Sequence, residues 1–377
     1  LTYGEQKIIQ NIIKSSQAYY IAEAGIEDAV YRITNLMSIS PNYLITLATG
    51  SVEVFVDSPN QNIRIITATG TVGAAFRKLE SRLNIETINP SFFYGAQVGD
   101  GGLVMENNST VNGNIFSDGN VIAVPSSQIA GTVKVAGVGN KIKGATITGD
   151  AYVDICDNSQ VTGTLYAATQ TACTYGAFVL SSPPSPIPLP IPQSDIDQWK
   201  TEAASGGTIG TQTYSSGTHE LGPVKIVGNL IVENTAVLVV KGTIWITGNV
   251  TVENSAMVKL DSSYGSLSGA IISDGIVTLQ NNTVSSGSGS IGSYLMYLST
   301  AALNPALVVQ NFAVVDIVYT SQGWINVQNN VSMRQITGYG IKVSNSATVT
   351  YEIGLQDVAF TSGPGGSWEV ASWKEIE

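Results

Sequence analysis

Residues 16–35, SQAYYIAEAGIEDAVYRITN, lie inside the only long helical segment that the sequence predicts. No proline occurs between Glu5 and Met37, and Gly25 is the one interior glycine of that segment. Apolar residues recur three or four positions apart, which is the spacing of an amphipathic helix. They are Ile8, Ile9, Ile12, Ile13, Tyr19, Tyr20, Ala24, Ile26, Val30, Ile33 and Met37. We therefore expect one helix of about 33 residues, roughly 50 Å long at 1.5 Å per residue.

Three segments of alternating apolar and polar residues follow the helix. They lie at 51–57 (SVEVFVD), 63–72 (IRIITATGTV) and 76–88 (FRKLESRLNIETI). A period of two is typical of strands with one buried face, so these segments predict an antiparallel meander that packs on the helix. Because the meander directly follows the helix, we expect it to cover the distal half, from about Ala24 to Ile33. The isoleucines of the proximal half would then remain uncovered.

A repeated unit dominates the second half of the chain. The segments 232–237 (VENTAV) and 252–257 (VENSAM) begin 20 residues apart, and related units recur at 279–284, 309–314, 327–331 and 343–349. A repeat near this length predicts a β-solenoid, with a β-sandwich or a barrel as the alternatives. Asn suits a solenoid corner because it tolerates the left-handed conformation and can stack on the next Asn. We therefore expect Asn234 and Asn254 to occupy equivalent places on neighbouring rungs.

The chain divides into four segments on this basis. Residues 1–89 form the helix and meander, and 90–180 form a β-rich or solenoid region. A linker at 181–207 begins with the polyproline-like run SSPPSPIPLPIPQ and ends in a short helix. Residues 208–377 form the β-solenoid and a C-terminal segment. The predicted fold class is thus mainly β, with a long N-terminal helix, a small antiparallel sheet and an Asn/Gly-cornered β-solenoid.

Composition narrows the class of protein. Charged residues make up 12% of the 377 residues, about half the usual fraction, and glycine is abundant with 39. This composition is typical of β-rich extracellular proteins. The net charge is −11, and no cluster of Lys and Arg occurs. Nucleic acid is therefore not an expected partner, and neither is an anionic membrane surface.

Residues 18–32, AYYIAEAGIEDAVYR, resemble the A-(F/Y)-Y-x-A-E-A-G-(I/V)-E signature of PilX-type, type IV pilin-like surface proteins. The matching signature residues are Ala22, Glu23, Ala24, Gly25 and Glu27. The Pro-rich run with its short helix and the closing segment 367–375, SWEVASWKE, also resemble such proteins with a solenoid extension.

This resemblance implies a pilin-like fold and assembly through the N-terminal helix. The partners implied are copies of the chain or other pilin-like subunits on the bacterial cell surface. In that family the proximal half of the helix is a membrane anchor, whereas polar residues interrupt it here. They are Gln6, Lys7, Gln10, Asn11 and Lys14. We therefore expect the anchor to lie outside this chain, or the assembly to dispense with it.

Two cysteines, Cys156 and Cys173, allow a single disulfide. Pairing is expected in a protein that its helix places outside the cell, and two buried thiols are the alternative. The residues are 17 positions apart, close to one rung, so neighbouring rungs about 4.8 Å apart could place them side by side.

Candidate catalytic residues are few. His219 is the only histidine, which leaves no Ser-His-Asp, Cys-His or His-rich metal site complete. Asp150, Asp154 and Asp157 could serve a glycan lyase or hydrolase, which needs two carboxylates at a set separation. Turns favour Asp for structural reasons, however, and no cofactor or metal site is indicated.

These observations predict a non-enzymatic surface or filament subunit. The residues expected to assemble it are Ile8, Ile9, Ile12, Ile13, Tyr19, Tyr20 and Ala24. The solenoid would be displayed and could adhere, with surface glycans as targets for its tyrosines. The alternative is a β-solenoid carbohydrate-active enzyme anchored by the helix, which a cleft with paired carboxylates and a basic neighbour would favour.

Overall fold

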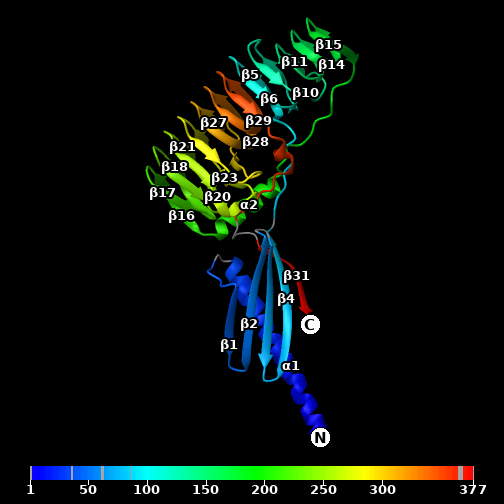
Figure 1. Ribbon diagram of the computed structural model, residues 1–377. Helices are drawn as coiled ribbons and strands as arrows, with labels where there is room; N and C mark the ends of the chain where they lie inside the picture. Colours follow the sequence, from blue (N-terminus) through cyan, green and yellow to red (C-terminus); the bar gives the residue numbers. More distant parts are fainter. Residues whose placement is uncertain (1, 35–36, 61–62, 86, 364–367, 377) are drawn as a thin grey trace. The chain divides into compact units, whose positions relative to one another are not determined.

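The computed structural model describes residues 2–34, 37–60, 63–85, 87–363 and 368–376. Two compact units account for them (Figure 1). The helix–sheet unit comprises Leu1–Thr87 and Gly363–Glu377, and the solenoid unit comprises Ile88–Ser362. The predicted fold class is confirmed: one long helix, a small antiparallel sheet and a large solenoid of parallel strands.

Helix α1 (Tyr3–Thr34) packs on the sheet through small side chains. Ala18, Ala22, Gly25 and Ala29 recur at intervals of four, three and four residues and are fully buried or nearly so. A Cβ at Gly25 would lie 2.6 Å from Val52 Cγ2, so only glycine fits there. The expectation that the meander covers the distal half of the helix is confirmed.

The described part of this sheet has five strands, in the order β1-β2-β3-β4-β31. Their bounds are β1 (Asn42–Leu47), β2 (Gly50–Asn60), β3 (Ile63–Val72), β4 (Ala75–Ile85) and β31 (Trp368–Ile376). The three predicted strands correspond to β2, β3 and β4. Two strands were not predicted: β1 is short and mostly exposed, and β31 comes from the far end of the chain.

The C-terminal strand is a difference from the predicted division of the chain, which placed residues up to 377 with the solenoid. Strand β31 instead pairs antiparallel with β4 and forms one edge of the small sheet. Cross-strand contacts favour this pairing: Lys374 forms an ion pair of 2.9 Å with Glu80, and the Arg64 guanidinium lies 4.7 Å from the Trp368 ring.

In the solenoid unit, all of which the structure describes, each rung contributes to three parallel stacks. Typical members are β20-β23-β26, β21-β24-β27 and β19-β22-β25. Inward-facing Val, Ile and Leu side chains form the interior. The strands of residues 96–180, the first arm, are β5 (Ala96–Met105), β6 (Thr110–Asn112), β7 (Ile115–Ser117), β8 (Val121–Ala123), β9 (Gln128–Ala130), β10 (Val133–Val135), β11 (Lys141–Lys143), β12 (Thr146–Ile147), β13 (Ala151–Asp157), β14 (Gln160–Thr171) and β15 (Thr174–Leu180).

Residues 208–350 form the second arm. Its strands are β16 (Thr208–Tyr214), β17 (Thr218–Leu221), β18 (Val224–Val232), β19 (Val237–Val240), β20 (Ile244–Ile246), β21 (Val250–Val252), β22 (Met257–Leu260), β23 (Gly269–Ser273), β24 (Val277–Leu279), β25 (Val284–Ser286), β26 (Leu295–Ser299), β27 (Leu307–Gln310), β28 (Val314–Gln328), β29 (Ser332–Ser344) and β30 (Thr348–Thr350). Single-turn helices η1 (Ser262–Tyr264) and η2 (Ile353–Asp357) lie beside it.

The two arms form one continuous solenoid. Strand β29 pairs in parallel with β5, and β30 pairs with β6, so the last rung of the second arm supports the first rung of the first arm. The chain therefore enters the solenoid at its middle, winds to β15, and returns to the opposite end at β16 (Figure 1). The separate segments expected at 90–180 and from 208 onward are joined because the same inward apolar columns run through both arms.

The Pro-rich run is the return path. Hydrogen bonds attach it to several rungs: Gly137 N donates to Pro184 O (3.1 Å), Gln97 Nε2 to Pro188 O (2.9 Å) and Tyr319 Oη to Ile191 O (2.9 Å). It leads to α2 (Gln193–Ser205), whose Ile196 and Trp199 cover an apolar patch on the outside of the solenoid. The run predicted as a linker is thus a strap that packs along one side.

A ladder of asparagines marks one corner of the solenoid. From Asn281 onward, each amide donates to the Oδ1 of the Asn on the preceding rung, at 2.8–3.0 Å. The residues, all at positive φ, are Asn254, Asn281, Asn311, Asn329, Asn345 and Asn107. Asn234 also has a positive φ and lies one rung from Asn254, because Val232 pairs with Val252 and Val237 with Met257. The predicted equivalence of Asn234 and Asn254 is confirmed.

Candidate functional site

The proximal half of α1 has an apolar surface that the rest of its unit does not cover. Every residue from Tyr3 to Lys14 is exposed. The exposed fractions are 61% for Ile8, 44% for Ile9, 61% for Ile12 and 51% for Ile13. Four neighbouring isoleucines in water form an apolar patch of the kind that marks an interaction surface.

This patch continues along the side of the helix that faces away from the sheet. At 100° per residue, Ile9, Ile13, Tyr20 and Tyr31 point to one side, opposite the buried Ala18 and its companions. Tyr20 is 67% exposed and Tyr31 is 61% exposed. From Ile9 to Tyr31 the stripe is roughly 33 Å long at 1.5 Å per residue. We call this surface, with Ile8, Ile12 and Ala24, the free helix face.

The signature residues divide between two environments. Ala22 and Gly25 are buried against the sheet, whereas Ala24 and Glu27 are exposed and Glu23 is half-buried. The first pair is explained by close packing. The other three make no contribution to the core of the unit, so the fold alone does not account for them. Of the residues expected to assemble the protein, Tyr19 is half-buried against the core and the others are exposed.

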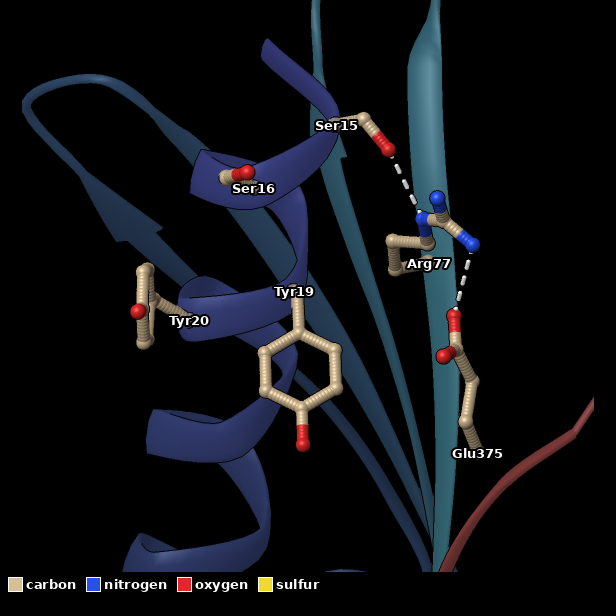
Figure 2. Close-up of a pocket in the computed structure, with 6 residues that line it drawn as sticks. All are labelled: Ser15, Ser16, Tyr19, Tyr20, Arg77 and Glu375. Atoms are coloured by element: carbon tan, nitrogen blue, oxygen red, sulfur yellow. Dashed lines mark hydrogen bonds and ion pairs between the residues drawn. The ribbon is translucent and has the colours of Figure 1, made fainter. Parts of the chain in front are cut away.

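A small pocket of about 190 Å³ is lined by residues of α1, β4 and β31 (Figure 2). Arg77 on β4 donates from Nε to Ser15 Oγ (2.8 Å) and forms an ion pair of 2.8 Å with Glu375 on β31. Tyr19 and Tyr20 meet edge to face, with ring centroids 5.9 Å apart. Arg77 thus links Ser15, which directly follows the exposed segment of α1, to β4 and, through Glu375, to β31. Sequence analysis missed this cluster because Glu375 lies almost the whole chain away from Ser15.

A second attachment holds the distal half of α1 to the edge strand β1. Asp28 accepts from Arg32 Nε (2.7 Å) and from Tyr43 Oη (2.9 Å). The hydrogen bond from Arg32 holds the pKa of the Asp28 carboxyl below its usual value. Burial, with this carboxylate as its acceptor, raises the pKa of the Tyr43 hydroxyl.

The carboxylates singled out in the sequence are occupied by turn contacts. Asp150 Oδ1 accepts from Thr164 N (2.7 Å), Asp154 Oδ2 accepts from Gly139 N (2.7 Å), and Asp157 forms an ion pair of 3.4 Å with Lys143. His219 stacks on Tyr214 with centroids 4.2 Å apart and contacts Ser216 O. Within the described residues, no group of three His, Cys, Asp or Glu side chains is arranged to hold a metal ion.

The structure instead brings together Asp316, Arg334 and Glu352 at a cleft of about 300 Å³. Arg334 forms ion pairs with both carboxylates, and Tyr294 Oη donates to Glu352 Oε2 (3.0 Å). Burial raises the pKa of the Asp316 carboxyl. Asp316 also accepts from Gly287 N (2.8 Å) and Leu295 N (3.0 Å), so it fixes both ends of the loop between them. The three charged residues are spaced 18 apart, and this rung-length spacing of alternating charge is the signal that could have revealed them.

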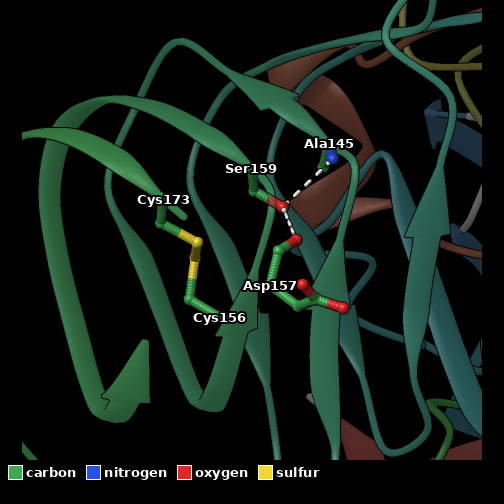
Figure 3. Close-up of a disulfide and its surroundings, with 5 residues drawn as sticks. All are labelled: Ala145, Cys156, Asp157, Ser159 and Cys173. Atoms are coloured by element: carbon green, nitrogen blue, oxygen red, sulfur yellow. Dashed lines mark hydrogen bonds between the residues drawn. A yellow bond between two sulfur atoms is a disulfide. The ribbon is translucent and has the colours of Figure 1, made fainter. Parts of the chain in front are cut away.

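Cys156 and Cys173 form a disulfide with a Cα–Cα distance of 6.4 Å (Figure 3). Cys156 on β13 pairs in register with Gln170, and Cys173 lies in the turn three residues further on. The rung is therefore shorter here than the one expected from the repeat. Ser159 supports the turn next to it, since its Oγ donates to Asp157 O (2.9 Å) and accepts from Ala145 N (3.1 Å).

Comparisons with known proteins do not identify a family for this chain. No family model matches the chain, and neither does any curated protein. Among solved structures, the competence-associated pilin ComZ from Thermus thermophilus matches 96% of this chain and 97% of its own, at 13% sequence identity and a TM-score of 0.31. Likeness at this level establishes neither a shared fold nor a shared function. Over the residues that the structure describes, no helix combines the length and apolar character needed to span a bilayer.

Proposed function

We propose that the protein is a non-enzymatic structural subunit of a filament on the bacterial surface. It assembles through the free helix face with copies of itself or with other pilin-like subunits, and it displays the solenoid unit. The observation that carries this proposal is the exposure of Ile8, Ile9, Ile12 and Ile13 on a helix that its own sheet covers only in the distal half.

Helix physics supports a partner for this surface. A helical segment of about 12 residues is marginal in water without tertiary packing. Each isoleucine that becomes fully buried contributes roughly 1.5–3 kcal/mol. Packing against the same stripe on neighbouring helices would therefore both order the proximal half and drive assembly. Glu23, Ala24 and Glu27, which the core does not use, would lie in the same interface.

A location outside the cell is part of the proposal. The disulfide between Cys156 and Cys173 supports it, because such bonds persist in oxidising environments. The low content of charged residues and the β-solenoid are consistent with it.

The test is a double variant, Ile9→Asp with Ile12→Asp, examined by negative-stain electron microscopy and light scattering of the purified protein. We expect filaments or oligomers from the unchanged protein and none from the variant, with an unaltered solenoid. Ile291→Asp with Ile353→Asp is the matched control, since both of these isoleucines are strongly exposed on the solenoid unit. An unchanged protein that is a monodisperse monomer, or a variant that still assembles, would contradict the proposal.

Glycan cleavage is the second candidate function, favoured by the cleft at Asp316, Arg334 and Glu352. A buried carboxyl with a raised pKa beside a second carboxylate is an arrangement that glycosidases use. A structural role is the other explanation for Asp316, because this carboxylate accepts from Gly287 N and Leu295 N and so anchors the loop between them. Release of reducing ends from a polysaccharide panel, abolished by Glu352→Gln, would establish the enzyme. No product from the unchanged protein, or equal product from the unchanged protein and this variant, would exclude glycan cleavage at this cleft.

A further inference from the structure

A groove of about 450 Å³ lies on the outside of the first arm, between Tyr94 and strand β13. Its volume falls in the range of small-molecule sites, which is about 300–1,000 Å³. We propose that this groove binds a neutral pyranose residue of a glycan. The residues that carry the argument are Tyr94, Asn114, Thr132, Lys134, Asp150 and Tyr152.

Two columns with the same repeat build the groove. Phe116, Lys134 and Tyr152 are register partners on β7, β10 and β13, so their side chains form one outward column. Asn114, Thr132 and Asp150 each precede these strands by one residue and form the flank. Residues on successive rungs are spaced about 4.8 Å apart, so the groove is roughly two rungs tall.

Aromatic rings bound the groove at both ends. Tyr94 is half-buried and packs on Phe116, with centroids 5.4 Å apart. Tyr152 stacks on Tyr166 with centroids 4.3 Å apart and planes inclined by only 2°. This stacking occupies one face of Tyr152 and holds the ring rigid, and the other face is turned toward Lys134 on the neighbouring rung, whose Nζ lies over it at the groove. The electron-rich face of an aromatic ring attracts the polarised C–H groups of a sugar ring.

Hydrogen-bonding groups surround that face. Lys134 Nζ lies 5.6 Å from the Tyr152 centroid and takes part in none of the ion pairs among the described residues. Asp150 uses Oδ1 for Thr164 N, and Asn114 uses Oδ1 for Thr132 N. The Asp150 Oδ2, the Asn114 amide and the Lys134 ammonium are thus available as one acceptor and two donors. Adjacent sugar hydroxyls both donate and accept, and they match this set.

Charge selects the class of ligand. The groove has one cation, Lys134, and one anion, Asp150, so the net charge of its lining is near zero. A phosphate or nucleotide would need more positive charge than one lysine beside a carboxylate supplies. A purely apolar ligand would leave both charges without partners. A neutral pyranose, which has a C–H face and hydroxyls at its rim, satisfies all of these groups.

The groove lies within the solenoid unit, so binding itself does not depend on assembly. Its use in adhesion rests on the proposed filament, in which many copies would act together and raise the avidity of a weak site. The assembly variant Ile9→Asp with Ile12→Asp should therefore bind glycan as the unchanged protein does. This separates a failure of the glycan site from a failure of the filament.

The experiment is an array of neutral and acidic glycans probed with the full chain, followed by calorimetric titration with the best-bound neutral oligosaccharide. Tyr152→Ala should weaken binding at least tenfold, or about 1.4 kcal/mol. Tyr152→Phe, which keeps the ring, should retain most of it. Lys134→Gln should weaken binding severalfold. Tyr339→Ala, at a tyrosine that is 39% exposed elsewhere on the solenoid, is the control and should have no effect.

Two results would overturn the proposal. One is an array on which no neutral glycan is bound. The other is glycan binding that persists unchanged in both Tyr152→Ala and Lys134→Gln, because the ligand would then lie elsewhere. The thermal transition of each variant shows whether the solenoid is intact. If Tyr152→Ala disturbs the stack with Tyr166, Lys134→Gln still tests the site, because this substitution removes no buried contact.

Discussion

Gly70 on β3 lies directly beneath Ala18 on α1, so closely that a Cβ at Gly70 would lie 2.1 Å from the Ala18 carbonyl oxygen. The helix backbone and the sheet backbone are therefore in contact at this point. A side chain here requires α1 to move away from β3, and the buried alanines around Ala18 would lose their contacts.

Gly70→Ala should consequently destabilise the helix–sheet unit by about 1–3 kcal/mol, the usual cost of overpacking. Hydrogen exchange of the α1 amides, resolved by mass spectrometry, measures this for the unit separately from the solenoid. Gly4→Ala is the control because a Cβ at Gly4 meets no other atom within 4 Å. Equal protection of α1 in both variants would show that the close approach is not required.

The disulfide should stabilise the end of the first arm. A loop of 17 residues predicts about 3 kcal/mol on the chain-entropy model, so Cys156→Ser with Cys173→Ser should speed amide exchange from β13 to β15. Exchange in the second arm should stay the same. Complete alkylation of both thiols in the native, unreduced protein would show that the bond does not form.

The asparagine ladder should tolerate glycine better than alanine. Asn281 has φ = 60°, donates to Asn254 and accepts from Asn311. Asn281→Ala loses both hydrogen bonds and places in the left-handed region a residue that tolerates it less well than asparagine, at a cost of about 2–3 kcal/mol together. Asn281→Gly loses the hydrogen bonds without that strain, so its urea midpoint should lie between those of the alanine variant and the unchanged protein. The reverse order would mean that backbone conformation does not select Asn here.

The helix–sheet unit should lose stability in acid through Asp28. The folded-state pKa of this carboxyl is lowered by Arg32, so its contribution is fully present above the unfolded pKa of about 3.9 and is lost as the pH falls through the folded pKa. Below pH 4 the α1 amides should therefore exchange faster than at pH 6, after correction for intrinsic rates. In Asp28→Asn this part of the pH dependence should disappear. A variant with the same acid profile as the unchanged protein would exclude Asp28 as its source.

Local patterns were sufficient for much of this fold. The apolar period predicted α1, alternation predicted β2 to β4, and the recurring Asn predicted the solenoid corner that Asn254 and Asn281 form. Pairings between distant parts of the chain were not predictable in this way. Strand β31 joins β4, and Arg77 meets Glu375, because of the tertiary fold and not because of any local preference.

The candidate sites show the same division. The uncovered isoleucines followed from counting how much of α1 a small sheet could reach. The groove at Tyr152 required the rung register, which varies along the chain: Lys134 pairs with Tyr152, 18 residues on, whereas Tyr152 pairs with Tyr166, only 14 residues on. A single repeat length therefore could not have aligned Lys134 with Tyr152 and also Tyr152 with Tyr166.

The junction of β29 with β5 affects how the chain must fold as it is synthesised. Strand β5 is complete at Met105, but its partner residues in β29 extend to Val343, so that edge has no native neighbour until about 240 more residues have been added. At about 5–20 residues per second, the wait is roughly 12–48 s. Throughout that time the first arm presents a bare strand edge and open apolar columns to every other chain nearby. The nascent protein must therefore be kept apart from its own copies until the second arm arrives and closes the joint.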